Sequence, residues 1–118
     1  MIRYRFGDVV LVPFPFTDPD AAGKRPAVVV STEVYKWQRP DLVIMAITSQ
    51  VEPASYMKDI PVREWKEAGL LHPSVIKPMF ATLERNRVVQ KIGRLTGKDR
   101  SVLNNVLKML VGEPDRDA

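Results

Sequence analysis

The sequence of 118 residues contains no cysteine and only one histidine. The absence of cysteine excludes a disulfide framework and a thiolate metal site, and it fits a reducing compartment. The longest apolar runs are far shorter than the roughly 20 residues of a membrane-spanning helix. Charged residues occur near the N-terminus where a secretory signal needs its apolar centre. We therefore expect a cytoplasmic protein without a membrane partner.

Signals for bound metals and cofactors are also missing. The sequence has no glycine-rich phosphate loop, no cluster of metal-ligand residues and no internal repeat, so we expect neither metal nor cofactor. The lone histidine, His72, has no ligand or triad partner nearby in the sequence, and we expect a surface or packing residue. The length predicts one domain over residues 1–118. The net charge of +4 favours polyanionic partners but does not distinguish nucleic acid from an acidic protein.

Most of the sequence is typical of short strands separated by turns. We expect strands at residues 9–12, from Pro26 onward, at 42–47, 59–62 and 74–77, and over 80–95 as one strand or a bent pair. In residues 42–47 (LVIMAI) the side chains on both faces of the strand are apolar, which indicates a central strand covered on both sides. The loop of about ten residues after the first strand favours an antiparallel pair over a parallel crossover.

The helical signals are fewer. We expect single helical turns at residues 35–37 and 64–68, the second ended by Gly69. Thr96, with Asp99 three positions later, is typical of a helix N-terminus. The following helix has an apolar face made by Val102, Leu103, Val106, Leu107 and Leu110. Because strands and helices do not alternate, the elements predict a mainly β (α+β) antiparallel barrel with a C-terminal helix.

Residues 23–31 (GKRPAVVVS) lead from a charged loop directly into an apolar strand. Pro26 keeps Arg25 out of helical geometry and donates no hydrogen bond, so it suits the first position of a strand. Arg25 therefore stands at a rigid junction, from which a guanidinium can be aimed at a phosphate. The alternative is a solvated charge at a strand end, and the residues alone favour that alternative.

Two other polar groups have two interpretations each. The third strand ends in Thr48, Ser49 and Gln50, which either meet water or present donors beside the Arg25 junction if the two strands pair. The basic residues late in the chain form either a stripe for a polyanion or a charged edge strand protected from aggregation. Those residues are Arg85, Arg87, Lys91 and Arg94.

Several of these stretches together resemble the MazF/PemK family of toxin endoribonucleases from type II toxin-antitoxin systems. They are residues 7–9 (GDV), 23–31 (GKRPAVVVS), 47–49 (ITS), 74–76 (SVI) and 88–95 (VVQKIGRL), followed by the closing helix. The resemblance covers nearly the whole chain and implies the SH3-like antiparallel barrel of CcdB/MazF/PemK-like plasmid maintenance toxins. It further implies a homodimer and metal-independent, sequence-specific cleavage of single-stranded RNA. The implied protein partner is a cognate antitoxin, with DNA bound only indirectly through the antitoxin complex.

The resemblance also implies a site. The family's catalytic arginine and threonine match Arg25 and Thr48, and we expect RNA-binding roles for Asp20, Lys24, Ser49 and Gln50. Attack of a ribose 2'-hydroxyl on the adjacent phosphate builds negative charge that Arg25 can stabilise, while Thr48 positions the phosphate. Asp20 is a candidate general base. The family's loop commonly carries Glu-Gln before the glycine, whereas this chain has residues 20–22 (DAA), so we expect an altered sequence preference.

Two other classes of function stay open. A CcdB-like relative inhibits gyrase through the end of its C-terminal helix, which closes with an aromatic residue, but residues 113–118 (EPDRDA) contain none. The third class is a non-catalytic SH3-like module that binds nucleic acid or only an antitoxin. Incubation with RNA in the presence of EDTA separates the three classes, because only the nuclease cleaves.

Overall fold

The computed structural model describes residues 3–13, 23–32, 39–49 and 59–112. Within these residues six strands form one antiparallel sheet in the order β4-β5-β3-β2-β1-β6. The elements are β1 (Asp8–Val12), β2 (Arg25–Val29), β3 (Asp41–Thr48), β4 (Ile60–Val62), β5 (Ser74–Glu84), the 3-10 helix η1 (Arg85–Arg87), β6 (Gln90–Arg94) and α2 (Gly97–Leu110).

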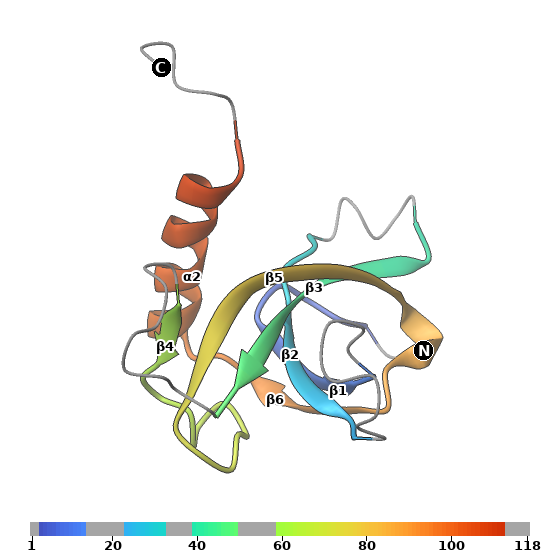
Figure 1. Cartoon of the computed structure of the whole chain (residues 1–118), viewed down its shortest axis with the longest axis horizontal. Helices are drawn as coiled ribbons and strands as arrows, with labels where there is room; N and C mark the ends of the chain where they lie inside the picture. Colours follow the sequence, from blue (N-terminus) through green and yellow to red (C-terminus); the bar gives the residue numbers. More distant parts are fainter. Residues whose placement is uncertain (1–2, 14–22, 33–38, 50–58, 113–118) are drawn as a thin grey trace.

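The sheet curls on itself into a half-barrel, and α2 stands beside β4 at one side of it (Figure 1). This arrangement confirms the predicted mainly β antiparallel fold with a C-terminal helix. The helical turn expected at residues 35–37 lies outside the described residues. No helix in the described part of the chain is long and apolar enough to span a membrane.

β3 lies inside the sheet, between β2 and β5, and both of its faces are covered. Met45 and Ile47 pack into a buried cluster that also contains Leu103 of α2. Ile44 and its neighbours on the other face pack into a second cluster that contains Val10 of β1. The predicted central strand is therefore confirmed. Burial of each large aliphatic side chain here stabilises the fold by about 1.5–3 kcal/mol.

The prediction of separate strands at residues 74–77 and 80–95 is wrong, because β5 runs without a break from Ser74 to Glu84. The pairing with β3 explains how it continues through Pro78. Met45 faces Phe80 and Ile47 faces Ile76, so residues 77–79 all stand opposite Ala46. Such a bulge takes residues out of the hydrogen-bonded ladder, and a proline is tolerated there.

The turn at residues 63–70, which follows β4, rests on β6 at the opposite edge of the sheet. A Cβ atom added at Gly93 would overlap the Ala68 carbonyl, and one added at Gly69 would overlap the Ile92 carbonyl. Gly69 also has φ +92°, a conformation that favours glycine. The two glycines therefore let the turn and β6 approach closely, which closes the curl of the sheet.

The N-terminus of α2 is tied to the same turn. The Thr96 hydroxyl caps the helix by accepting from the Asp99 amide at 3.5 Å, as predicted. The buried Asp99 carboxylate accepts from the amides of Arg63 and Glu64 at 3.1 and 2.9 Å. Glu64 in turn accepts from the Thr96 hydroxyl at 2.5 Å. Asp99, the acidic residue predicted in the helix cap, therefore also fixes the turn at residues 63–70 against the N-terminus of α2.

β6 is an edge strand, and two of its basic residues meet one buried carboxylate. Asp8 is fully buried at the start of β1, with Lys91 Nζ 3.1 Å from Oδ2 and Arg94 Nε 3.6 Å from Oδ1. The Arg5 amide also donates to Oδ2 at 2.7 Å. Burial, and then the charges of Arg100 and Arg5, lower the pKa of Arg94, while Asp8 raises it. These contacts favour the edge-strand interpretation for Lys91 and Arg94.

Candidate functional site

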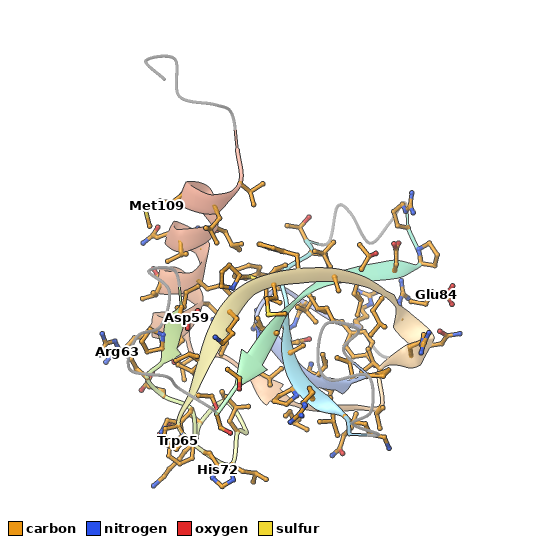
Figure 2. The ribbon with its side chains drawn as sticks, viewed as in Figure 1. Asp59, Arg63, Trp65, His72, Glu84 and Met109 are labelled. Atoms are coloured by element: carbon orange, nitrogen blue, oxygen red, sulfur yellow. The ribbon has the colours of Figure 1, made fainter. Side chains whose placement is uncertain are left out.

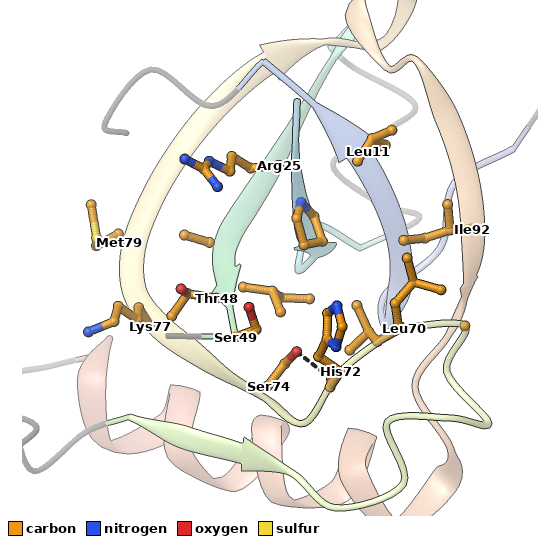
Figure 3. Close-up of a pocket in the computed structure, with 15 residues that line it drawn as sticks. Leu11, Arg25, Thr48, Ser49, Leu70, His72, Ser74, Lys77, Met79 and Ile92 are labelled. Atoms are coloured by element: carbon orange, nitrogen blue, oxygen red, sulfur yellow. Dashed lines mark hydrogen bonds between the residues drawn. The ribbon is translucent and has the colours of Figure 1, made fainter. Parts of the chain in front are cut away.

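Arg25 and Thr48 lie at the same end of two paired strands. Ala27 of β2 faces Ala46 of β3 in the antiparallel ladder. The same register, continued by two residues, sets Arg25 opposite Thr48. Both residues line one pocket (Figure 3). Pairing of the two strands was the condition under which the sequence placed these side chains together, and β2 and β3 do pair.

The pocket has a volume of about 510 Å³ and contains both apolar and polar side chains. Its polar side chains come from the ends of β2 and β3 and from β5 with the residues just before it. Arg25, Thr48, Ser49, His72, Ser74 and Lys77 are the polar ones, beside Leu11, Pro26, Ala46, Ile47, Gly69, Leu70, Leu71, Met79 and Ile92. No aspartate or glutamate occurs among these lining residues. The pocket therefore suits a ligand that carries negative charge next to an apolar group.

Arg25 is exposed, and its guanidinium makes neither an ion pair nor a hydrogen bond with any other described residue. Its backbone is fixed by pairing, because Arg25 faces Val12 and Pro26 faces Leu11 on β1. Figure 3 shows the side chain extending toward the side of the pocket where Met79 lies. A positive charge on a rigid backbone, without a counter-ion in the described part of the chain, can receive an anionic ligand.

Thr48 is half-buried as the last residue of β3, and Ser49 is exposed directly after it. Their hydroxyls approach the pocket from the strand that faces β2 on one side and β5 on the other. Lys24 is exposed beside Arg25 but does not line the pocket. Asp20 and Gln50 lie outside the described residues, so their expected roles stay predictions.

The sequence did not indicate the contribution of β5 and the residues before it. Lys77 and Met79 belong to the bulge opposite Ala46, and this bulge brings both side chains to the pocket. His72 is exposed, as expected of a surface residue, but it lines the pocket. The Ser74 hydroxyl donates to the His72 carbonyl at 2.8 Å and fixes the backbone there.

A signal for His72 was present in the sequence. His72 and Pro73 come directly before β5, and Arg25 and Pro26 are the first two residues of β2, so a polar residue followed by proline occurs where each strand starts. Metal-ligand chemistry has no comparable signal, because no group of three or more histidine, aspartate or glutamate residues that could hold a metal ion occurs among the described residues. The site therefore offers guanidinium, ammonium, hydroxyl and imidazole groups around an apolar surface.

Comparison with known proteins identifies relatives over nearly the whole chain. Residues 5–111 match the family described as PemK-like, MazF-like toxin of type II toxin-antitoxin system. An endoribonuclease MazF from Staphylococcus saprophyticus is 24% identical over 109 residues, which cover 92% of this chain and 91% of that protein.

Solved structures with low sequence identity show the same fold. A mycobacterial endoribonuclease, solved in complex with its cognate antitoxin, has a TM-score of 0.73 at 18% identity and covers 97% of this chain and 99% of its own. A MazE-MazF structure from Deinococcus radiodurans has a TM-score of 0.71 at 18% identity and covers 97% of this chain and 100% of its own. The half-barrel with its C-terminal helix is thus shared with MazF structures.

Proposed function

The chain belongs to the family of PemK-like, MazF-like toxins of type II toxin-antitoxin systems, and from this membership we propose that it is an endoribonuclease acting on single-stranded RNA. The observation that carries the proposal is the position of Arg25, which lacks a counter-ion among the described residues and lies opposite Thr48 in a pocket without acidic lining residues. A similar protein from Staphylococcus saprophyticus is named as an endoribonuclease.

The proposed reaction is a transesterification within the RNA, in which the phosphorus exchanges its bond to a 5'-oxygen for a bond to the neighbouring 2'-oxygen. The ribose 2'-oxygen attacks the adjacent phosphorus, its proton leaves to a base, and the bond from phosphorus to the 5'-oxygen breaks with protonation of that oxygen. Arg25 stabilises the extra negative charge on the five-coordinate phosphorus, and a fixed donor of this kind contributes about 3–4 kcal/mol to such a step. Because a guanidinium is a poor proton donor, we assign Arg25 this electrostatic role only.

Thr48 is proposed to hold the phosphate in place by donating its hydroxyl to a phosphate oxygen. The charge that a metal ion supplies in other nucleases is supplied here by side chains, so we propose a metal-independent reaction. The apolar lining offers contact surface for nucleobases next to the scissile phosphate, and the polar side chains of Ser49, His72 and Ser74 beside it can bind base edges, so we propose a sequence-specific reaction. Lys24 and Ser49 are proposed to bind neighbouring parts of the RNA, and Asp20 remains the candidate base.

We further propose a cognate antitoxin as the protein partner. The mycobacterial structure with the same fold was solved with its cognate antitoxin. A pocket that attracts RNA phosphates also attracts the carboxylates of an acidic segment, so binding of such a segment blocks the substrate. DNA is then reached only through the antitoxin complex.

A homodimer is proposed from the small core and from apolar side chains that the fold leaves exposed. Met109 is 66% exposed and projects from α2 away from the sheet (Figure 2), and Val102 and Val111 are exposed as well. Light scattering coupled to size-exclusion chromatography at tens of micromolar measures this state. A monomer at that concentration contradicts the proposal of a dimer.

The proposed activity is tested by incubating the purified protein with mixed single-stranded RNA in EDTA. We expect cleavage that leaves a 2',3'-cyclic phosphate and a 5'-hydroxyl, and mapping of the RNA ends gives the preferred sequence. Retention of RNA without cleavage supports the non-catalytic module. A protein that neither retains nor cleaves RNA supports the gyrase-binding alternative.

Two substitutions at one position test the role of Thr48. Thr48→Val keeps the branched shape and removes the hydroxyl, so we expect cleavage to fall by about ten- to a hundredfold, the usual effect of losing a hydrogen bond to a charged group. Thr48→Ser keeps the hydroxyl and should retain most of the activity. Full activity in Thr48→Val together with a loss in Thr48→Ser would indicate that the methyl group, rather than the hydroxyl, is what the site requires.

A further inference from the structure

Lys77 is the second basic side chain that lines the pocket, and no sequence signal assigned it a role. It belongs to the bulge in which residues 77–79 stand opposite Ala46. Its side chain is 26% exposed, so the ammonium group is held partly within the protein and still reaches solvent. Arg25 enters the same pocket from β2. Two strands that are not neighbours in the sheet thus each contribute one cationic side chain to the lining of one pocket.

Lys77 differs from Arg25 in having a counter-ion. Its Nζ lies 3.4 Å from Oδ2 of Asp59, whose side chain is only 8% exposed. Figure 2 shows Asp59 beside β4, and Asp59 is not among the residues that line the pocket. The Asp59 carboxylate therefore holds the ammonium end of Lys77, while the Lys77 side chain forms part of the pocket wall. A lysine ammonium has three donors, so one bond to Asp59 leaves others for a ligand.

We propose that Lys77 binds a phosphate of the RNA strand next to the scissile one, and that Asp59 positions the Lys77 ammonium for this contact. The inference rests on the proposed function and adds a second phosphate site to it. Lysine suits this role because a compact ammonium accepts phosphates over a range of approach angles, whereas the guanidinium of Arg25 favours a two-pronged geometry. Binding of the neighbouring phosphate would fix the direction in which the strand crosses the pocket.

A structural ion pair between Lys77 and Asp59 is the competing explanation. It predicts that the pair contributes to stability and that RNA binding is indifferent to it. Partly exposed ion pairs contribute little to stability, whereas an unpartnered buried carboxylate is costly. Lys77→Met alone leaves Asp59 without its cation, so a loss of binding in that variant could follow from a disturbed fold.

The charge-neutral double variant Lys77→Met with Asp59→Asn avoids this problem. It removes both partners, keeps the net charge of the protein and leaves no unpaired buried carboxylate. Lys77→Arg keeps the positive charge in the pocket. Lys108→Met is the matched control, because Lys108 is an exposed lysine of α2 that does not line the pocket.

Binding is measured by fluorescence anisotropy with a labelled single-stranded oligoribonucleotide of mixed sequence, 2'-O-methylated to prevent cleavage. At about 50 mM salt we expect the double variant to bind about tenfold more weakly than the wild type. The slope of log K against log salt concentration should become shallower by about 0.7, the value for one lost phosphate contact on a single strand. Lys77→Arg should keep the slope of the wild type. Lys108→Met should keep both the affinity and the slope.

The outcomes separate this inference from the function on which it rests. A wild type that neither binds nor cleaves RNA overturns both. A wild type that binds and cleaves, with a folded double variant of unchanged affinity and slope, overturns only the role of Lys77 and shows a structural pair. Weaker binding with an unchanged slope also overturns the phosphate contact, because a lost phosphate contact must reduce counterion release.

Discussion

The basic residues on β6 and those that line the pocket differ in what neutralises their charge. On β6, Lys91 and Arg94 lie 3.1 and 3.6 Å from the carboxylate of Asp8, which is fully buried. In the pocket, Arg25 has no counter-ion among the described residues, and Lys77 pairs with Asp59 but is itself partly exposed to solvent. Lys91 and Arg94 therefore share one fully buried carboxylate away from the pocket, whereas Arg25 and Lys77 line the pocket, where they can meet a ligand.

This comparison decides between two interpretations of the late basic residues that the sequence alone did not distinguish. Four basic residues late in the chain looked equally like a polyanion-binding stripe and a charged edge strand. Residues 8 and 94 are far apart in the sequence, yet they face each other across β1 and β6. The pairing of these strands, not the number of charges on them, decides that Lys91 and Arg94 bind Asp8.

The largest effect is expected from Arg25→Ala. Loss of the guanidinium should lower RNA cleavage about a hundred- to a thousandfold, because the contact is strongest in the transition state. RNA binding should weaken far less. The melting temperature should move by no more than a few degrees, since the side chain is exposed and contributes little packing. Single-turnover cleavage and thermal unfolding measure the two quantities.

Arg25→Lys is the matched variant for this position. A point charge cannot reproduce a two-pronged contact with phosphate oxygens, so we expect only partial recovery of the rate. Normal cleavage by Arg25→Ala would show that the residue has no part in the reaction. Unfolding of the same variant would show that Arg25 is a structural residue like Arg94.

Asp8→Asn should have the opposite profile. The substitution leaves Lys91 and Arg94 without their carboxylate, and we expect a loss of about 3 kcal/mol in the free energy of unfolding, as when a buried ion pair loses one partner. The rate of cleavage per folded molecule should not change. Urea denaturation with a parallel cleavage assay tests both statements, and a lowered rate in the folded variant would mean that the charges on β6 also serve the reaction.

Much of the fold could be predicted from the sequence because its signals are local. The apolar run of residues 42–47 predicted a covered central strand, and Thr96 with Asp99 predicted the start of α2. The continuity of β5 could not be predicted, because Pro78 is tolerated only through a three-residue bulge against β3. The bulge arises from the register between β3 and β5, so neither strand carries a sequence pattern that predicts it.

The grouping of side chains at the candidate site could also be predicted in part, while their roles stay predictions. The junction at Arg25 and the polar end of β3 at Thr48 are visible in the sequence, and the antiparallel register brings the two residues opposite each other. Lys77 was not predicted, because its approach to the pocket depends on the bulge. His72 could have been found from its proline neighbour, which repeats the pattern of Arg25 and Pro26.

A smaller effect on stability is expected from a substitution at the contact between β6 and the turn beside the pocket. Gly93→Ala would push the turn at residues 63–70 away from β6, since the added methyl overlaps the Ala68 carbonyl. We expect a loss of about 2 kcal/mol in the free energy of unfolding, typical of overpacking. The turn contains Gly69 and leads to His72, both of which line the pocket, so RNA affinity in anisotropy should fall a few fold as well. Unchanged affinity would show that the pocket holds its shape without this closure.

The smallest effect is expected from Lys91→Met, which tests the comparison most directly. Asp8 keeps Arg94 and the Arg5 amide as partners, and Lys91 is a third exposed, so the loss should be about 1 kcal/mol or less in the free energy of unfolding. Because its charge is already used by Asp8, RNA affinity should stay within about twofold of the wild type and the salt slope should not change. Removing one positive charge is the same for this variant as for Arg25→Ala, so net charge does not explain a difference between them. A tenfold loss of affinity with a shallower slope in Lys91→Met would instead mean that β6 contacts RNA, and that basic residues outside the pocket also bind it.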